Sequence, residues 1–249
     1  IPITHPQFCR AGEDARHRVR MRQALESGHG IIANSQATLD ALADFAGDEG
    51  LAVPPAIVAH LGVEPLNAAP TGRVHPRPYF LAIGTIEARK NHALLLRLWH
   101  QLRERMGAAT PDLIFIGQRG WLADDVFAEL DGAPALHGPV IEWGRCDDAA
   151  MATAIANARA VLMPSHIEGY GLPVLEALAL GAPVIAHKLD VYREIAGDMP
   201  LLIDVADETR WLAAIMDYSQ PSPQREQRLA AAQSFTLPRW EHHIAAVND

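Results

Sequence analysis

The feature that most constrains the fold is the alternation, from Tyr79 onward, of short continuous apolar runs with helical patterns. The apolar runs are residues 79–83, 113–116, 140–143, 160–163, 183–186 and 201–203, and the helical patterns are 91–105, 121–130, 149–157 and 173–180, with a short turn at 191–195. Strands that are apolar on both faces are typical of a parallel sheet covered by helices on both sides. The pattern therefore predicts a doubly wound α/β domain. Three further helices are expected at 208–218, 223–234 and 238–247.

The beginning of the chain has a different layout. It predicts a helix at 15–26, a strand at 30–33, a helix at 35–45 with Asn34 or Ser35 as N-cap, and a strand at 56–60. Residues 63–78 are rich in proline and small residues, which indicates a linker. Because about sixty residues are too few for a complete Rossmann-like domain, we expect residues 1–62 to be the tail of one.

Composition narrows the class of protein. The net charge of −9 argues against a nucleic-acid binder, which normally presents a basic face. Cys9 and Cys146 lack CxxC partners and indicate free thiols in a reducing compartment, with one long-range disulfide as the alternative. No apolar run is long enough to span a membrane, and the first residues do not resemble a signal peptide. We therefore expect a cytoplasmic protein.

One local cluster runs against the acidic balance. Five arginines are predicted to share a single helical stretch: Arg10, Arg16, Arg18, Arg20 and Arg22. The interpretation we favour is a solvated helix face, because acidic residues lie among them. The alternative is a surface for an anionic acceptor or for lipid headgroups.

The segment after the fourth apolar run has the character of a ligand site. The predicted strand ends at Pro164, so the next residues lie at the carboxyl edge of the sheet, where α/β folds bind ligands. Gly169 and Gly171 are expected to let the backbone turn sharply and approach a ligand. Pro173 suits the first position of a helix, and Gly181 suits its end. The free amides at this helix N-terminus favour an anionic ligand.

Two carboxylates occupy this same place. Glu168 precedes the predicted helix and Glu176 lies in its second turn. Carboxylates are poor partners for phosphate but good acceptors for sugar hydroxyls. Together the features suit a nucleotide sugar, which has both groups. The alternative is that Glu168 caps the loop and Glu176 lies on a solvated helix face.

These residues carry a family resemblance. Residues 164–184, PSHIEGYGLPVLEALALGAPV, resemble the E-x7-E signature of retaining GT-B glycosyltransferases of the GT4 type. The resemblance implies that Glu168 contacts hydroxyls of the donor sugar and that Glu176 holds the nucleotide ribose. It also implies that the donor phosphates lie near the backbone of Gly169, Tyr170, Gly171 and Leu172.

The first strand is followed by candidates for the phosphate side. Residues 84–92, GTIEARKNH, resemble the GTIE-x-RKN subgroup of this family, with Thr85 where many relatives have an arginine. Gly84 lies where the strand turns, and an arginine fork with a lysine charge, Arg89 and Lys90, suits a diphosphate. The alternative is that both are ordinary polar residues at a helix entrance. The resemblance implies that Arg89 and Lys90, with Glu168, are catalytic and that no metal or other cofactor is required.

The resemblance as a whole implies a GT-B fold. Its expected parts are a partial acceptor-side domain at 1–62, the linker at 63–78, a Rossmann-like donor domain at 79–236 and a C-terminal helix at 237–249 that packs back towards the first domain. The family's catalytic histidine loop would lie before Ile1, and His5 is not at its position, so we assign no general base.

The expected activity is transfer of a hexose, with retention, from a nucleoside diphosphate sugar to a glycan or lipid-linked acceptor. The subgroup resembles bacterial mannosyl- and rhamnosyltransferases of polysaccharide assembly, which makes GDP-mannose the first candidate donor. It also implies possible peripheral contact with the inner face of the membrane. The alternatives are a nucleotide-sugar-binding fragment that is inactive alone, or a GT-B-fold epimerase or phosphorylase. A Rossmann dehydrogenase is poorly supported, because no GxGxxG follows the first strand.

Overall fold

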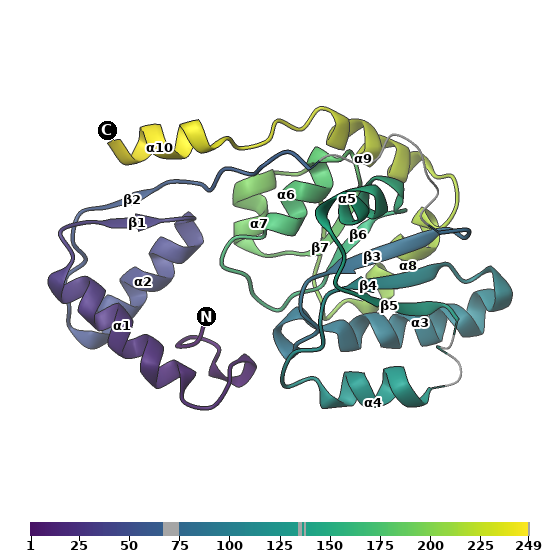
Figure 1. Ribbon diagram of the computed structural model, residues 1–249, viewed down its shortest axis with the longest axis horizontal. Coiled ribbons are helices and arrows are strands. Elements are labelled where there is room, and N and C mark those ends of the chain that lie inside the picture. Colours follow the sequence, from purple (N-terminus) through teal and green to yellow (C-terminus); the bar gives the residue numbers. More distant parts are fainter. Residues whose placement is uncertain (67–74, 134–135, 137, 249) are drawn as a thin grey trace.

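The computed structural model of the chain describes residues 1–66, 75–133, 136 and 138–248, and its main part is built on one parallel sheet (Figure 1). The strands are β3 (Tyr79–Ile83), β4 (Asp112–Ile116), β5 (Val140–Gly144), β6 (Val161–Met163), β7 (Val184–His187) and β8 (Leu201–Ile203), in the order β5-β4-β3-β6-β7-β8. The order reverses between β3 and β6, which makes their shared edge the topological switch point of the sheet. The predicted doubly wound α/β domain is confirmed.

Helices cover both faces of this sheet. They are α3 (His92–Met106), α4 (Asp124–Gly132), α5 (Asp148–Asn157), α6 (Leu172–Ala179), α7 (Asp190–Ala196), α8 (Glu208–Tyr218) and α9 (Pro223–Gln233), with short 3-10 turns η2 (Ala88–Lys90) and η3 (Gly107–Ala109). Successive side chains of β3 point to opposite faces: Leu81 joins the core under α5, α6 and α7, and Phe80 joins the core under α3, α4 and α8. Both faces of the sheet are therefore buried against helices, which explains why the apolar runs are continuous.

The first part of the chain forms a smaller unit beside the main sheet (Figure 1). After the turn η1 (Pro6–Phe8) come α1 (Glu13–Ser27), β1 (Ile31–Ala33), α2 (Gln36–Glu49) and β2 (Ala56–Val58). β1 and β2 pair in parallel, and α2 packs against both. The chain ends in α10 (Trp240–Asn248), which contacts β2, and Val63 N donates to Pro238 O at 2.9 Å. The last helix therefore returns to the unit that begins the chain.

Four of the five clustered arginines lie on α1, and Arg10 does not. α1 begins at Glu13, and Arg10 lies before it, with its guanidinium 4.7 Å from the centre of the Trp121 ring. Arg18 and Arg22 both pair with Glu49 of α2. The prediction of one helical stretch was wrong for Arg10, because Gly12 in a left-handed conformation stops the helix from extending back to it.

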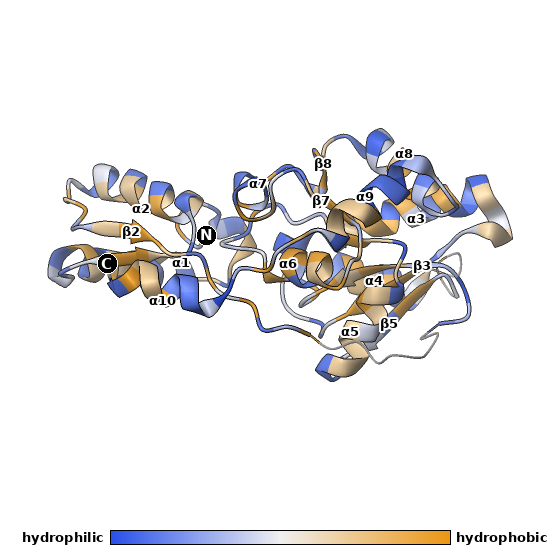
Figure 2. Cartoon of the chain, turned by 90° about the horizontal axis from the view of Figure 1, so that it is seen from above, coloured by the Kyte–Doolittle hydropathy of each residue, from blue (hydrophilic) through white to orange (hydrophobic). Residues whose placement is uncertain are grey.

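Three smaller expectations can be compared with the structure. Residues 67–74 of the predicted linker lie outside the described residues. Cys9 and Cys146 are free thiols, so the alternative of a disulfide between them is not the one observed. Hydrophobic residues gather in the strands and inner helix faces, with hydrophilic residues on the outer surfaces (Figure 2). Within the described part of the chain, no helix has the length and apolar character needed to cross a membrane.

Candidate functional site

The candidate site lies where the loops after β3 and β6 meet, at the switch point of the sheet. The backbone N–H of His166 donates to Arg89 O at 2.9 Å, and Asn91 Nδ2 donates to Pro164 O at 3.2 Å. Asn91 is held in a left-handed conformation with φ of 56°, between η2 and α3. These bonds join two loops that are more than seventy residues apart in the sequence into one unit.

Three charged side chains meet at this unit. Arg89 Nη1 lies 2.6 Å from Glu168 Oε2, and Lys90 Nζ lies 2.6 Å from Glu168 Oε1, so each carboxylate oxygen has its own cation. We call these three residues the switch-point triad. Their side chains are only 19%, 12% and 9% exposed for Arg89, Lys90 and Glu168. Glu168 is therefore in direct contact with both cations.

A fourth charged residue completes the arrangement. Glu87 is almost fully buried, and its Oε1 lies 2.6 Å from Arg89 Nη2, so Arg89 bridges two carboxylates. The other oxygen, Oε2, has no hydrogen-bond partner among the described residues. Sequence reasoning missed Glu87, although it lies inside the GTIEARKNH stretch two residues before Arg89. An acidic residue next to two expected cations was the signal that could have found it.

The electrostatic environment keeps Glu168 ionised. Burial alone would raise its pKa, but the charges and hydrogen bonds of Lys90 and Arg89 outweigh burial and hold the pKa below its ordinary value. Burial would likewise lower the pKa of Arg89, but the carboxylates of Glu168 and Glu87 raise it. The site therefore combines two cations, Arg89 and Lys90, with two carboxylates, Glu168 and Glu87.

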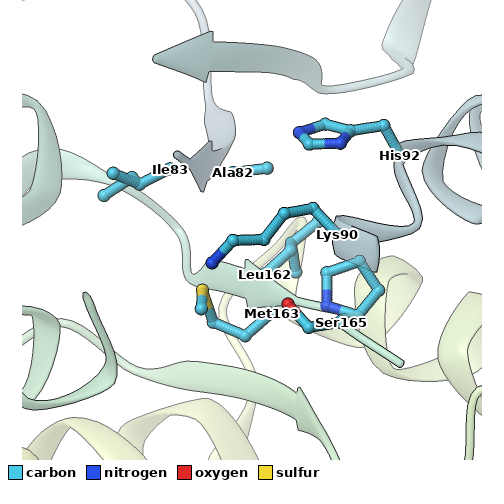
Figure 3. Close-up of a pocket in the computed structure, with 8 residues that line it drawn as sticks. Ala82, Ile83, Lys90, His92, Leu162, Met163 and Ser165 are labelled. Carbon is cyan, nitrogen blue, oxygen red and sulfur yellow. The ribbon is translucent and has the colours of Figure 1, made fainter. Parts of the chain in front are cut away.

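Gly84 and a small cavity shape the place where Lys90 lies. Gly84 has a φ of 122°, and a Cβ there would lie 3.3 Å from Lys90 Cε. Figure 3 shows the Lys90 side chain running across a cavity between the ends of β3 and β6. The cavity is lined by Ala82, Ile83, Lys90, His92, Leu162, Met163, Pro164 and Ser165. Thr85 packs against the next loop, because a Cβ on Gly120 would lie 2.4 Å from its methyl group.

The helix after Glu168 begins as predicted, with two corrections. Gly171 is the N-cap of α6, with a φ of 111°, and a Cβ there would lie 2.6 Å from the Tyr192 ring. Pro173 occupies the second position of α6, not the first. Gly169 does not have a positive φ, and a Cβ on it would meet no atom within 4 Å. The backbone therefore requires a glycine at 171, whereas at 169 the glycine only leaves open space.

Glu176 and Tyr170 lie in contrasting surroundings. Glu176 is half-buried on α6, and burial together with the nearby Asp148 raises its pKa. The alternative of a solvated helix face does not fit such a position. The Tyr170 side chain is buried and points to the N-terminal unit, where its hydroxyl donates to Leu61 O at 3.0 Å. Burial raises the pKa of Tyr170 to about 12. Leu172 is 39% exposed at the start of α6.

The N-terminal segment borders the site. The ring of Phe8 stacks on His166 with 4.9 Å between centroids, and Trp121 Nε1 donates to Phe8 O at 3.3 Å. Among the described residues, no group of three or more His, Cys, Asp or Glu side chains is placed to hold a metal ion.

Comparison with known proteins places the chain. Residues 77–220, more than half of it, match the family described as "Glycosyl transferases group 1". The chain belongs to this family. The matched range contains the whole switch-point triad, and it confirms the GT4-type resemblance seen in the two motifs.

A curated relative and two solved structures agree with the family. The chain is 35% identical over 168 residues to O-antigen chain mannosyltransferase B of Escherichia coli, covering 66% of this chain and 43% of that protein. WaaG, a glycosyltransferase involved in lipopolysaccharide biosynthesis, superposes with a TM-score of 0.74 at 18% identity, over 95% of this chain and 67% of WaaG. S. aureus TarM, solved with UDP, gives a TM-score of 0.73 at 15% identity, over 97% of this chain and 48% of TarM. The expected GT-B fold is confirmed, and the chain spans less than half the length of the E. coli relative and of TarM.

Proposed function

We propose that this chain carries the donor site of a retaining hexosyltransferase that uses a nucleoside diphosphate sugar. The observation that carries the proposal is the switch-point triad, in which Arg89 and Lys90 are both 2.6 Å from Glu168. Two cations at the carboxyl edge of a doubly wound sheet suit a diphosphate, and the carboxylate between them suits sugar hydroxyls. The ligand-free triad holds these groups ready in charged form.

In the proposed reaction the donor exchanges partners within the triad. The diphosphate forms ion pairs with Arg89 and Lys90 in place of Glu168, and the Glu168 carboxylate then accepts hydrogen bonds from the sugar hydroxyls. The bond between the sugar and the diphosphate breaks, and its electron pair stays on the diphosphate oxygen. The acceptor hydroxyl oxygen bonds to the sugar carbon, and the hydroxyl proton passes to the departing diphosphate. Arg89 and Lys90 stabilise the charge that develops on the leaving diphosphate, which lowers the barrier. No described residue is assigned as the base for the acceptor.

The proposed contacts around the triad follow the family pattern. Glu176 holds the ribose hydroxyls, and the backbone from Gly169 to Leu172, at the N-terminus of α6, lies near the phosphates. Gly84 and Thr85 border the phosphate side. The two cations supply the neutralisation of the diphosphate, so the proposed transfer needs no metal.

The proposed substrates are GDP-mannose and a hydroxyl acceptor on a growing glycan or a lipid-linked glycan. The name of the E. coli relative, O-antigen chain mannosyltransferase B, supports mannose as the sugar. The proposed place of the reaction is the cytoplasmic face of the inner membrane. The exposed arginines of α1, Arg16 and Arg20, are candidates for peripheral contact with it.

A calorimetric titration of the chain with GDP-, UDP- and dTDP-sugars, with and without EDTA, tests the donor proposal. We expect saturable binding of GDP-mannose that EDTA does not change. Failure of every sugar nucleotide to bind would overturn the proposal, and loss of binding in EDTA would overturn its metal-free part.

Transfer is tested separately by product analysis with a mannose-terminated acceptor. Binding without turnover supports the alternative of a donor-binding fragment that is inactive alone. Conversion of the donor without an acceptor would support an epimerase.

A further inference from the structure

Glu194 joins the two structural units of the chain. It lies on α7 of the main sheet, but its carboxylate accepts hydrogen bonds at the N-terminus of α2, from Gln36 N at 2.6 Å and Ala37 N at 3.3 Å. His60 Nε2, after β2, lies 2.7 Å from the same carboxylate. A carboxylate at a helix N-terminus satisfies free amides and complements the helix dipole. Glu194 is thus an N-terminal cap supplied to α2 from the other unit.

The helix that Glu194 holds reaches the loop of the donor site. Ser35 is the N-cap of α2, and its Oγ lies 3.2 Å from Gly169 O. Thr38 Oγ1, one turn along, lies 3.1 Å from the same carbonyl oxygen. Gly169 is the residue next to Glu168. The first turn of α2 therefore rests directly on the loop that carries the central carboxylate of the triad.

The next residue of that loop is tied to the same unit. The Tyr170 hydroxyl donates to Leu61 O at 3.0 Å, and the Tyr170 and His60 rings lie 6.2 Å apart. On its other side, the Glu168 carboxylate contacts Arg89 and Lys90, which follow β3 of the main sheet. A displacement of the N-terminal unit relative to the main sheet would therefore move Gly169 and Tyr170 while Arg89 and Lys90 stayed in place.

We propose that Glu194 is a positioning residue that, by capping α2 from α7, holds Ser35 and Thr38 on Gly169 and thereby sets the position of Glu168. The inference rests on the proposed function in naming the donor sugar as the group that Glu168 recognises. Glu194 itself touches neither the triad nor the proposed donor. Its role is to couple the placement of the N-terminal unit to the recognition of the sugar part of the donor.

The test uses two variants and one matched control in the 249-residue chain. Glu194→Gln keeps the shape of the side chain and removes the charge that caps α2. The double variant Ser35→Ala, Thr38→Val leaves Glu194 intact and removes both hydroxyls from Gly169. The control is Glu208→Gln, because Glu208 also forms an ion pair, with Arg97 at 2.7 Å, on a helix that is not part of this contact.

The first readout is hydrogen–deuterium exchange of the ligand-free chain. Local opening speeds exchange only where contacts are lost. We expect both variants to exchange about 5-fold faster or more in the peptide spanning 167–172, with β3 and β4 unchanged, and the control to match the wild type. Unchanged exchange at 167–172 in both variants would overturn the proposal. If Glu194→Gln speeds exchange throughout the chain, the double variant decides the test: faster exchange at 167–172 supports the proposal, and unchanged exchange there overturns it.

The second readout separates positioning from simple stability. We expect the affinity for GDP-mannose relative to that for GDP to fall by about 5-fold or more in the variants, a coupling of ordinary size between sites, while GDP itself binds no more weakly than to wild type. The inference would be overturned if the affinities for GDP and GDP-mannose fell by the same factor, or if neither affinity changed. If the wild type binds no nucleotide or sugar nucleotide, the proposed function fails, and the exchange result still decides whether Glu194 positions the loop.

Discussion

Replacing Glu168 with glutamine removes the charge that Arg89 and Lys90 share in the ligand-free chain. The amide has nearly the same shape and can still accept one hydrogen bond, but its nitrogen cannot accept from either cation. The triad is then left with two cations and, through Arg89, the remaining partner Glu87. The proposed exchange of partners therefore predicts that Glu168→Gln makes the ligand-free chain less stable but binds a diphosphate more tightly.

The magnitude follows from the two contacts of 2.6 Å. Charge-assisted hydrogen bonds contribute about 1 kcal/mol more than neutral ones, so losing the charge on two such bonds costs about 2 kcal/mol of unfolding free energy. For a chain of this size that lowers Tm by about 4–8 °C. The same contacts compete with phosphate in the wild type. Their loss should tighten binding of GDP by about 5-fold if one contact must break, and by about 30-fold if both must.

Calorimetry with GDP and GDP-mannose, and thermal melting with and without GDP, measure these effects. We expect Glu168→Gln to melt lower than wild type alone, to recover most of the difference with saturating GDP, and to lose its preference for GDP-mannose over GDP. Glu208→Gln, which removes a surface ion pair, is the control and should change neither the melting temperature nor the affinity for GDP or GDP-mannose. Weaker or unchanged GDP binding in a folded Glu168→Gln chain would refute the exchange of partners.

Three further changes test neighbouring parts of the site. Burial raises the pKa of Glu176, so its ionised carboxylate lowers the stability of the fold, and wild type should gain stability relative to Glu176→Gln as the pH falls towards the ordinary value of 4.5. A stability difference that does not change with pH would contradict this pKa shift. In calorimetry, Glu176→Ala should bind GDP about 10-fold more weakly than wild type. Lys90→Ala should weaken the binding of GDP by about 10-fold and leave the binding of guanosine unchanged. Equal loss of affinity for both ligands would show that Lys90 does not bind the phosphates. Gly171→Ala adds a Cβ 2.6 Å from the Tyr192 ring at a positive φ, so it should lower stability by about 2–3 kcal/mol in denaturant unfolding. Gly169→Ala is its matched control, and similar losses in both would show that the backbone account is wrong.

The sequence predicts the main sheet well because burial leaves a strong pattern there. The strands β3 and β8 have the predicted bounds, and the other strands of the main sheet differ by about one residue. Both faces of these strands are buried, so their apolar runs are continuous and short. The motif of residues 164–184 likewise placed Glu168 and the start of α6 at the carboxyl edge of the sheet, because a glycine and a proline are tied to that turn.

The contacts inside the site could not be read in the same way. Which side chains meet depends on the crossing of loops 78 residues apart, and periodicity gives no information on side-chain direction. The sequence therefore supplied Arg89, Lys90 and Glu168 but not their direct contact. Glu194 shows the same limit, because it lies on a short helix with no motif and acts on amides 157 and 158 residues away.

A crystal structure of the chain with bound GDP tests the central claim most directly. The account predicts phosphate oxygens within hydrogen-bonding distance of both Arg89 and Lys90, with Glu168 separated from at least one of them. Nucleotide bound elsewhere, with both contacts to Glu168 still at 2.6 Å, would contradict it.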